Sequence, residues 1–116
     1  MSNQKGDSYQ QEIFEEGLKL FRDFLFWEAH EKWEELWRIN KSNFVKGIIQ
    51  ISAAFHKIYK QKNVSGFYKI INNCQKYFQD REDFIYLLME LKQHYQDSLK
   101  SIHEKFCYLL ENYEKE

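Results

Sequence analysis

The amino-acid sequence predicts an all-α fold, a compact bundle of about five helices. Apolar residues recur at helical spacings along most of the 116-residue chain. Proline is absent and there are only four glycines, which suits long helices and leaves little material for the turns of a β sandwich. Hydrophobic residues make up 43% of the chain and aromatic residues 18%, so the composition favours a packed core over disorder.

The N-terminal residues are polar. We expect residues 1–7 to form a flexible tail and residues 8–116 to form a single helical-bundle domain. Ser8, with Gln11 three residues later, matches a capping box, which predicts that the first helix begins there. Residues 22–25 carry no strong stop signal, so a kink, a short turn and a continuous helix all fit the pattern at that point.

Residues 26–38, FWEAHEKWEELWR, predict an amphipathic helix. With about 100° per residue, Trp33 and Trp37 share a broad apolar arc, and the charged residues occupy the other side. We expect this helix to turn its indole rings inward and its carboxylates outward. His30 lies on the border between the two sides, one turn before Glu34. The resulting HExxE lacks the second histidine of the zinc-binding HExxH motif, so the chemistry of that protease class does not carry over.

Residues 44–62 are apolar on most sides of a predicted helix, which indicates a helix at the centre of the bundle. Gly47 lies in line with Ala54, seven residues later, and predicts the close approach of a neighbouring helix, because glycine costs about 1 kcal/mol of helix propensity relative to alanine and so needs a packing reason. Gln50 and His56 are polar and need partners if they are buried. Only about five residues separate this helix from the previous one, so the two should be antiparallel neighbours.

Two further segments complete the predicted bundle. Residues 63–66 break the helical pattern, and a fourth helix follows them. After a boundary near Asp80, apolar residues continue at helical spacing from Phe84 to Tyr113. One straight helix of roughly 30 residues would be about 45 Å long. Either this long C-terminal helix bends near residues 93–97, or its distal half packs on a second subunit in a homodimer.

Polar side chains from the two central helices form a candidate site. Antiparallel packing would allow the polar groups of residues 26–38 to meet Gln50 or His56. If the site is catalytic, Glu31 or Glu34 is the general base, oriented by His30 and Arg38. The full candidate polar site consists of Glu28, His30, Glu31, Glu34, Arg38, Gln50 and His56.

A metal ion is an alternative occupant of this site, because mixed histidine and carboxylate ligands suit zinc, manganese or iron. Helical bundles that hold two metal ions, however, repeat an ExxH motif on facing helices. Neither EAH at Glu28 to His30 nor HEKF at His103 to Phe106 has that spacing. We therefore assign no metal and no cofactor.

Charge and composition narrow the classes of partner. Lys+Arg 17 and Asp+Glu 18 give a net charge of −1, so no broad basic field supports binding to nucleic acid. No apolar run reaches the roughly 20 residues of a membrane span. The polar N-terminus lacks the apolar stretch of a signal peptide, and we expect a cytoplasmic protein. The one basic patch is small and consists of Lys57, Lys60, Lys62 and Lys69.

The two cysteines, Cys74 and Cys107, lie inside apolar helical patterns without the spacing of a metal-binding motif. Both are predicted to be core residues with free thiols, as in a protein from a reducing compartment.

Two blocks of the chain, LFRDFLFWEAHEKWEELWR and FVKGIIQISAAFHKIYKQKNVSGFYKII, resemble the signature blocks of the small all-helical family known as domain of unknown function 309. The residues that match the family pattern are Glu28, Ala29, His30, Glu31, Trp33, Glu34, Trp37 and Arg38, then Gly47, Ile49, Gln50, Ala53, Ala54 and His56, then Asn63 and Gly66. The resemblance covers about residues 20–74. Phe24 stands where the family usually has a turn glycine, a departure that weighs against a sharp turn there.

The resemblance implies a compact bundle of about five helices with the two signature helices at its centre. It implies no established reaction, substrate or cofactor. Two functions therefore compete. The aromatic surplus, the long last helix and the lack of a complete catalytic set favour a non-enzymatic module that binds a protein partner or itself. The alternative is a ligand- or metal-binding site, hydrolytic in one version, built on the EAHE helix and the facing helix with Gln50 and His56; the small-molecule ligand is then unknown.

Overall fold

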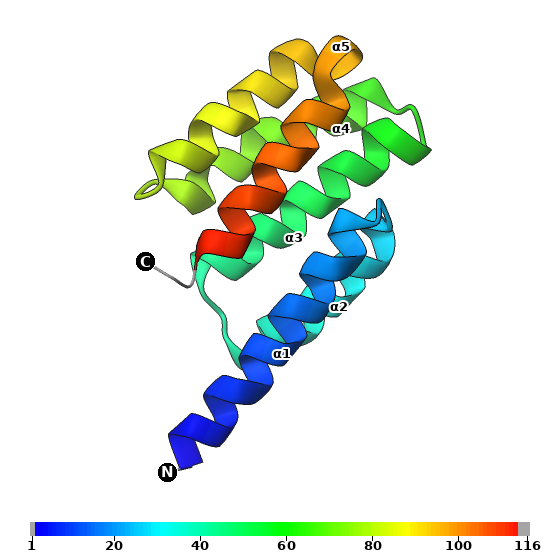
Figure 1. Ribbon diagram of the computed structural model, residues 1–116. Helices are drawn as coiled ribbons and strands as arrows, with labels where there is room; N and C mark the ends of the chain where they lie inside the picture. Colours follow the sequence, from blue (N-terminus) through cyan, green and yellow to red (C-terminus); the bar gives the residue numbers. More distant parts are fainter. Residues whose placement is uncertain (1, 114–116) are drawn as a thin grey trace.

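The structure is a computed structural model that describes the backbone of residues 2–113 and the side chains of residues 8–113. Within these residues there are helices and no β-strand, so the predicted all-α bundle is confirmed. A π-helical turn, His56–Lys60, continues α3, and a 3-10 turn, Gln75–Phe78, continues α4. The five helices are α1 (Ser2–Arg22), α2 (Phe26–Ile39), α3 (Asn43–Phe55), α4 (Val64–Cys74) and α5 (Glu82–Asn112) (Figure 1).

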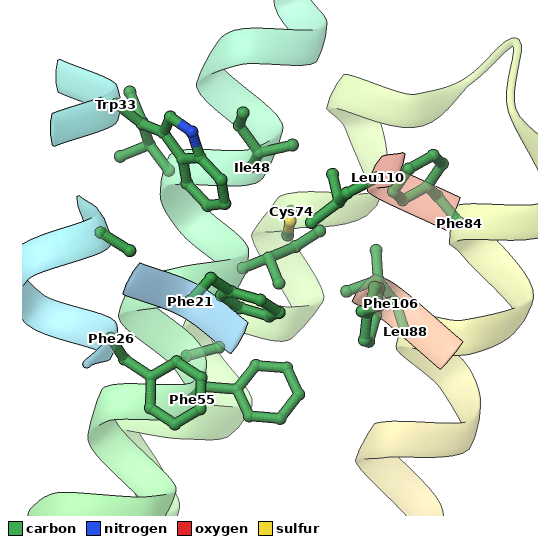
Figure 2. Packing of buried hydrophobic residues seen from close by; sticks show 14 of the residues in the cluster. Phe21, Phe26, Trp33, Ile48, Phe55, Cys74, Phe84, Leu88, Phe106 and Leu110 are labelled. Atoms are coloured by element: carbon green, nitrogen blue, oxygen red, sulfur yellow. The ribbon is translucent and has the colours of Figure 1, made fainter. Parts of the chain in front are cut away.

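Helix α3 lies at the centre of the bundle, as predicted. It packs against α2 on one side and α4 on the other, and α1 contacts both α2 and α5 (Figure 1). Most of its residues are buried, which explains why its sequence is apolar on most sides. Large aromatic side chains from several helices meet around it, among them Phe21, Trp33, Phe55 and Phe106 (Figure 2). Complete burial of each such side chain contributes roughly 1.5–3 kcal/mol to folding.

Polar side chains cap two of the helices at positions where the sequence has loop residues. The Ser42 hydroxyl accepts a hydrogen bond from the backbone N–H of Val45 at 3.2 Å, which caps α3. The Asn63 side chain accepts one from the backbone N–H of Gly66 at 2.9 Å, which caps α4. These bonds satisfy N–H groups that a helix leaves free at its start, so they help to set where α3 and α4 begin.

Helix α5 is bent, which decides between the two alternatives for the C-terminal segment. His94 and Ser98 have non-helical backbone angles, with φ of −127° and −128°. The two halves of α5 run back along each other (Figure 1). Lys105 Nζ lies 2.9 Å from Glu90 Oε1, although 15 residues of straight helix would separate them by about 22 Å. The distal half therefore packs on its own chain, and the length of α5 is no longer a reason for a second subunit.

The N-terminus of α1 differs from the prediction. The helix begins at Ser2, so Ser8 lies inside α1 and the predicted capping box is wrong. A capping box can bond to backbone N–H groups at the start of a helix, but it does not prevent the helix from extending further towards the N-terminus. The residues before Ser8 include no proline that would stop the helix. The division into a flexible tail at residues 1–7 and a domain at residues 8–116 remains a prediction.

A sharp turn joins α1 to α2, despite the phenylalanine at position 24. Phe24 has φ of 64°, in the left-handed region that usually favours glycine. Its ring centroid lies 4.1 Å from that of His103 and 5.1 Å from that of Tyr59. The expectation drawn from the missing glycine was therefore wrong, because contacts with these rings hold the strained residue in place.

Two glycines allow aromatic rings to approach the helix backbone closely. A Cβ atom at Gly17 would overlap the Trp33 indole, and one at Gly47 would overlap the ring of Phe78. The Trp33 Nε1–H donates a hydrogen bond to the carbonyl oxygen of Phe14 at 3.1 Å, so this buried indole is satisfied. The predicted packing role of Gly47 is confirmed.

The cysteines are buried and free, as predicted. Burial raises the pKa of the Cys74 thiol to about 12 and that of the Cys107 thiol to about 11. Both thiols are therefore protonated and poorly nucleophilic at neutral pH. None of the helices in the described part of the chain is both long enough and apolar enough to cross a membrane.

Candidate functional site

The two signature helices bring His30 and His56 together on the indole of Trp27. The His30 ring stacks on the indole with a centroid distance of 4.7 Å and an interplanar angle of 9°. The His56 ring lies 5.4 Å from the same indole at 41°. His30 comes from α2, and His56 is the first residue of the π-helical turn that follows α3. Because π-helical turns are frequent at functional sites, the position of His56 in one supports its place in a candidate site.

Both histidines leave a polar atom without a partner. The Nδ1 atoms of His30 and His56 are buried, and neither has a hydrogen-bond partner among the described residues. Glu34 Oε1 is 3.6 Å from His30 Nδ1, which is too long for a hydrogen bond. Most buried polar atoms in proteins are paired, so two unpaired nitrogens beside one indole require an explanation.

The charge state of His30 follows from its surroundings. Burial is the main reason that the pKa of His30 is lowered from its ordinary value of 6.5. Glu34 and Glu31 act in the opposite direction, whereas His56 and Lys46 add to the lowering. His30 is therefore neutral at pH 7, and its contact with Glu34 is not an ion pair at that pH.

An open cleft of about 540 Å³ is lined by Trp27 and His56, a size within the usual range of ligand sites, and His30 is not among its lining residues. Trp27, in its wall, is 47% exposed. The prediction that all indoles of α2 turn inward is therefore wrong for Trp27, although Trp33 is fully buried and Trp37 is half-buried. The residues lining the cleft are Leu25, Phe26, Trp27, Glu28, Glu31, His56, Lys60 and Gln61.

The N-terminus of α2 opens into this cleft without a cap. Leu25 occupies the N-cap position and provides no side-chain hydrogen bond. The backbone N–H groups of Phe26, Trp27 and Glu28 have no acceptor among the described residues. Free N–H groups at the start of a helix carry partial positive charge, which attracts anions.

Charged side chains complete the cleft. Neither Glu28 nor Glu31 forms an ion pair within residues 8–113, and both line the cleft. Lys60 lines it from the end of the π-helical turn, with its Nζ 5.5 Å from the ring centroid of Tyr59. The site thus has carboxylates, an ammonium group and an exposed indole within one opening.

The other predicted residues, His30 among them, do not line the cleft. Glu34 is exposed next to His30. Arg38 is exposed in the last turn of α2 and forms no ion pair with Glu34. Arg38 therefore does not orient the Glu34 carboxylate in the way that the sequence predicted. Gln50 is half-buried in α3, and its side chain has no hydrogen bond within the described residues. The structure therefore brings together Glu28, Glu31 and His56 in the cleft, with His30 stacked on Trp27 and Glu34 next to His30.

The chemistry that these residues can perform is limited. Within the part of the chain that the structure describes, no three His, Cys, Asp or Glu side chains are grouped closely enough to hold a metal ion. Ser52, one turn before His56, is fully buried and donates its hydroxyl hydrogen bond to the carbonyl oxygen of Ile49 at 2.8 Å. It is therefore a packing residue and not an activated nucleophile.

Sequence reasoning missed Trp27, Lys60 and Gln61 as site residues. A signal for Trp27 was present, because it shares a helical face with Glu31 and Glu34, four and seven residues later. A tryptophan on the charged face of an amphipathic helix is expected to be exposed, whereas one on the apolar face is expected to be buried. Lys60 and Gln61 had no such signal, since their position depends on the π-helical turn after α3.

The fold and the cleft define a small all-α bundle with a polar, aromatic site between its central helices. Residues 14–70 match the model of the family described as Domain of unknown function (DUF309), and the chain belongs to this family. This confirms the resemblance drawn from the two signature blocks. No curated protein and no solved structure matches the chain.

Proposed function

We propose that the cleft at Trp27 binds a small polar molecule and that the protein is a ligand-binding module. The observation that carries this proposal is an open cleft lined by the exposed indole of Trp27 and by His56, whose buried Nδ1 has no partner, while His30, with a second unpaired Nδ1, stacks on the same indole. Packing of the helices alone does not favour unpaired histidine nitrogens at this position. A buried polar group without a partner costs roughly 1–3 kcal/mol, and apolar residues of similar size would avoid that loss.

Binding is preferred to catalysis because the cleft has imidazoles and carboxylates but no activated nucleophile. The thiols of Cys74 and Cys107 have raised pKa values and lie elsewhere. A general base alone defines no reaction, so the proposal includes no catalytic step.

The test uses fluorine NMR of protein labelled with 5-fluorotryptophan, which has one resonance for each of the three tryptophans. Trp27→Phe and Trp37→Phe variants assign the resonances, and the fully buried Trp33 is the internal control. Benzamide, phenylalanine, phenethylamine and 3-phenylpropanoate are added singly at about 10 mM, enough to occupy a site of millimolar Kd. We expect at least one probe to shift Trp27 while Trp33 stays fixed. If no probe moves Trp27, the proposal fails.

Self-association is a second candidate function, supported by a different surface. Tyr86 is 73% exposed and Tyr108 is 66% exposed, and both line a groove of about 570 Å³ between the halves of α5. Tyrosine is a residue type that often anchors interfaces. The groove also has charges of both signs, Glu90 and Lys105, which pair with each other at 2.9 Å, so this pair adds no single-sign charge that would repel an identical face. Light scattering across a hundredfold range of concentration tests this candidate, and a monomer throughout would exclude it.

A further inference from the structure

Groups of opposite charge line different parts of the cleft at Trp27. The uncapped N-terminus of α2 and Lys60 attract a negative group, whereas Glu28 and Glu31 attract a positive one. We propose that the ligand is a zwitterion, a small molecule such as an α-amino acid that has both a carboxylate and an ammonium group. This inference rests on the proposed function of the cleft and adds the chemical class of its ligand.

The carboxylate half is recognised at the start of α2. Three backbone N–H groups there, those of Phe26, Trp27 and Glu28, lack acceptors among the described residues. By contrast, α3 and α4 each begin with a side-chain cap, from Ser42 and Asn63. A ligand carboxylate would accept hydrogen bonds from the free N–H groups, and Lys60 would add a charge of opposite sign.

The ammonium half is recognised by Glu31 and the indole of Trp27. Glu31 is exposed in the cleft wall and has no cationic partner within residues 8–113. The Trp27 indole stacks on His30 and has the His56 ring 5.4 Å away, and the side chain is nevertheless 47% exposed. An ammonium group close to an indole face is attracted by the electrons of the ring. Carboxylate and indole thus offer the ammonium group two partners.

A singly charged ligand fits this cleft less well than a zwitterion. A pure cation would leave the N–H groups of α2 and Lys60 without a partner, and a pure anion would lie beside Glu28 and Glu31 without compensation. His30 adds no positive charge at pH 7, because burial lowers its pKa. The two sets of charges therefore have to be matched by the ligand itself.

Three matched probes separate the two halves of the proposal: phenylalanine, phenethylamine, which lacks the carboxylate, and 3-phenylpropanoate, which lacks the amine. Their Kd values are measured by titration of the Trp27 fluorine resonance. Phenylalanine should bind about tenfold more tightly than either analogue, because each analogue loses one set of charge-assisted hydrogen bonds. Binding of either analogue as tight as that of phenylalanine would overturn the zwitterion assignment.

Two variants test which group recognises which charge. Glu31→Gln should weaken phenylalanine and phenethylamine about tenfold and leave 3-phenylpropanoate unchanged, whereas Lys60→Gln should weaken phenylalanine and 3-phenylpropanoate and leave phenethylamine unchanged. Lys62→Gln is the matched control for Lys60, since its Nζ also lies over the Tyr59 ring, at 5.8 Å, but Lys62 does not line the cleft. Glu12→Gln, on the exposed face of α1, is the control for Glu31.

The outcomes distinguish this inference from the proposed function. If benzamide shifts Trp27 while the three charged probes bind equally or not at all, the cleft binds ligands and the zwitterion class is wrong. Equal weakening of all three probes by Glu31→Gln would also overturn the assignment, because a change in the cleft's structure would then explain it. If no probe moves Trp27, the proposed function and this inference both fall.

Discussion

The turn that starts α2 allows a test of strain at Phe24. In the left-handed region, a residue with a Cβ atom costs roughly 1–2 kcal/mol, and glycine avoids most of that cost. Phe24→Ala should lose roughly 1–2 kcal/mol of unfolding free energy, because the half-buried ring no longer contacts His103 and Tyr59. Phe24→Gly loses the same ring but relieves the backbone. After about 0.5–1 kcal/mol for the greater freedom of glycine in the unfolded chain, we expect Phe24→Gly to be more stable than Phe24→Ala by about 1 kcal/mol.

The comparison has a matched control in the same protein. At Glu12, exposed in the regular part of α1, alanine should be more stable than glycine by about 1 kcal/mol. The sign of the glycine–alanine difference should therefore reverse between the two positions. Urea unfolding measures it, since a difference of about 1 kcal/mol moves the midpoint by roughly 0.3–1 M. If Phe24→Ala is at least as stable as Phe24→Gly, the strain assigned to this turn does not exist.

Two further predictions concern packing and pH. Gly47→Ala should lose about 1–3 kcal/mol of unfolding free energy, because its Cβ would overlap the Phe78 ring. In the control Gly66→Ala, the Cβ would meet only the end of the Asn63 side chain, so the unfolding free energy should change by less than about 1 kcal/mol. Equal losses in the two variants would contradict the close approach at Gly47. Since the folded-state pKa of His30 is lowered from 6.5, the unfolded chain binds more protons below that pH, and stability should fall as the pH drops from 7.5 to 5.5. His30→Gln should show a shallower fall in urea unfolding, and an unchanged slope would refute the assignment.

Periodicity and composition were sufficient to predict the helical bundle and the central position of α3. They predict which face of a helix is apolar, and Trp33 and Gly47 lie as expected. They do not predict where a long apolar pattern folds back. The spacing of apolar residues is nearly the same in a straight helix and in the bent α5, because residues on each side of His94 and Ser98 keep their own helical period.

The residues of the candidate site were predicted only in part. Glu28, Glu31 and His56 lie in one cleft because α2 and α3 are neighbours, which short connections predict. The separation of Arg38 from the cleft follows from its position at the far end of α2, ten residues after Glu28. A helical rise of about 1.5 Å per residue puts the two roughly 15 Å apart along the axis. Residues that share a motif, and even a helical face, can therefore be too far apart to share one site.

The position of the site also depends on residues outside the segment that matches the family. The matched residues, 14–70, include all the residues that line the cleft. Yet His103, from the second half of α5, supports the turn that begins α2. Its Nε2 lies 2.8 Å from the carbonyl oxygen of Phe21, and because a carbonyl can only accept, Nε2 carries the proton and His103 donates this bond. Burial lowers the pKa of His103, which favours this neutral form.

The His103 ring also packs against Phe24 at the strained position of the turn. The bend of α5 is what returns His103 to this place, since the distal half of a straight helix would extend away from α1. Two features that sequence patterns did not predict, the bend at His94 and Ser98 and the left-handed Phe24, are therefore connected through one buried histidine. Together they fix the start of α2, and with it the free N–H groups and the indole of Trp27 on which the proposed ligand site is built.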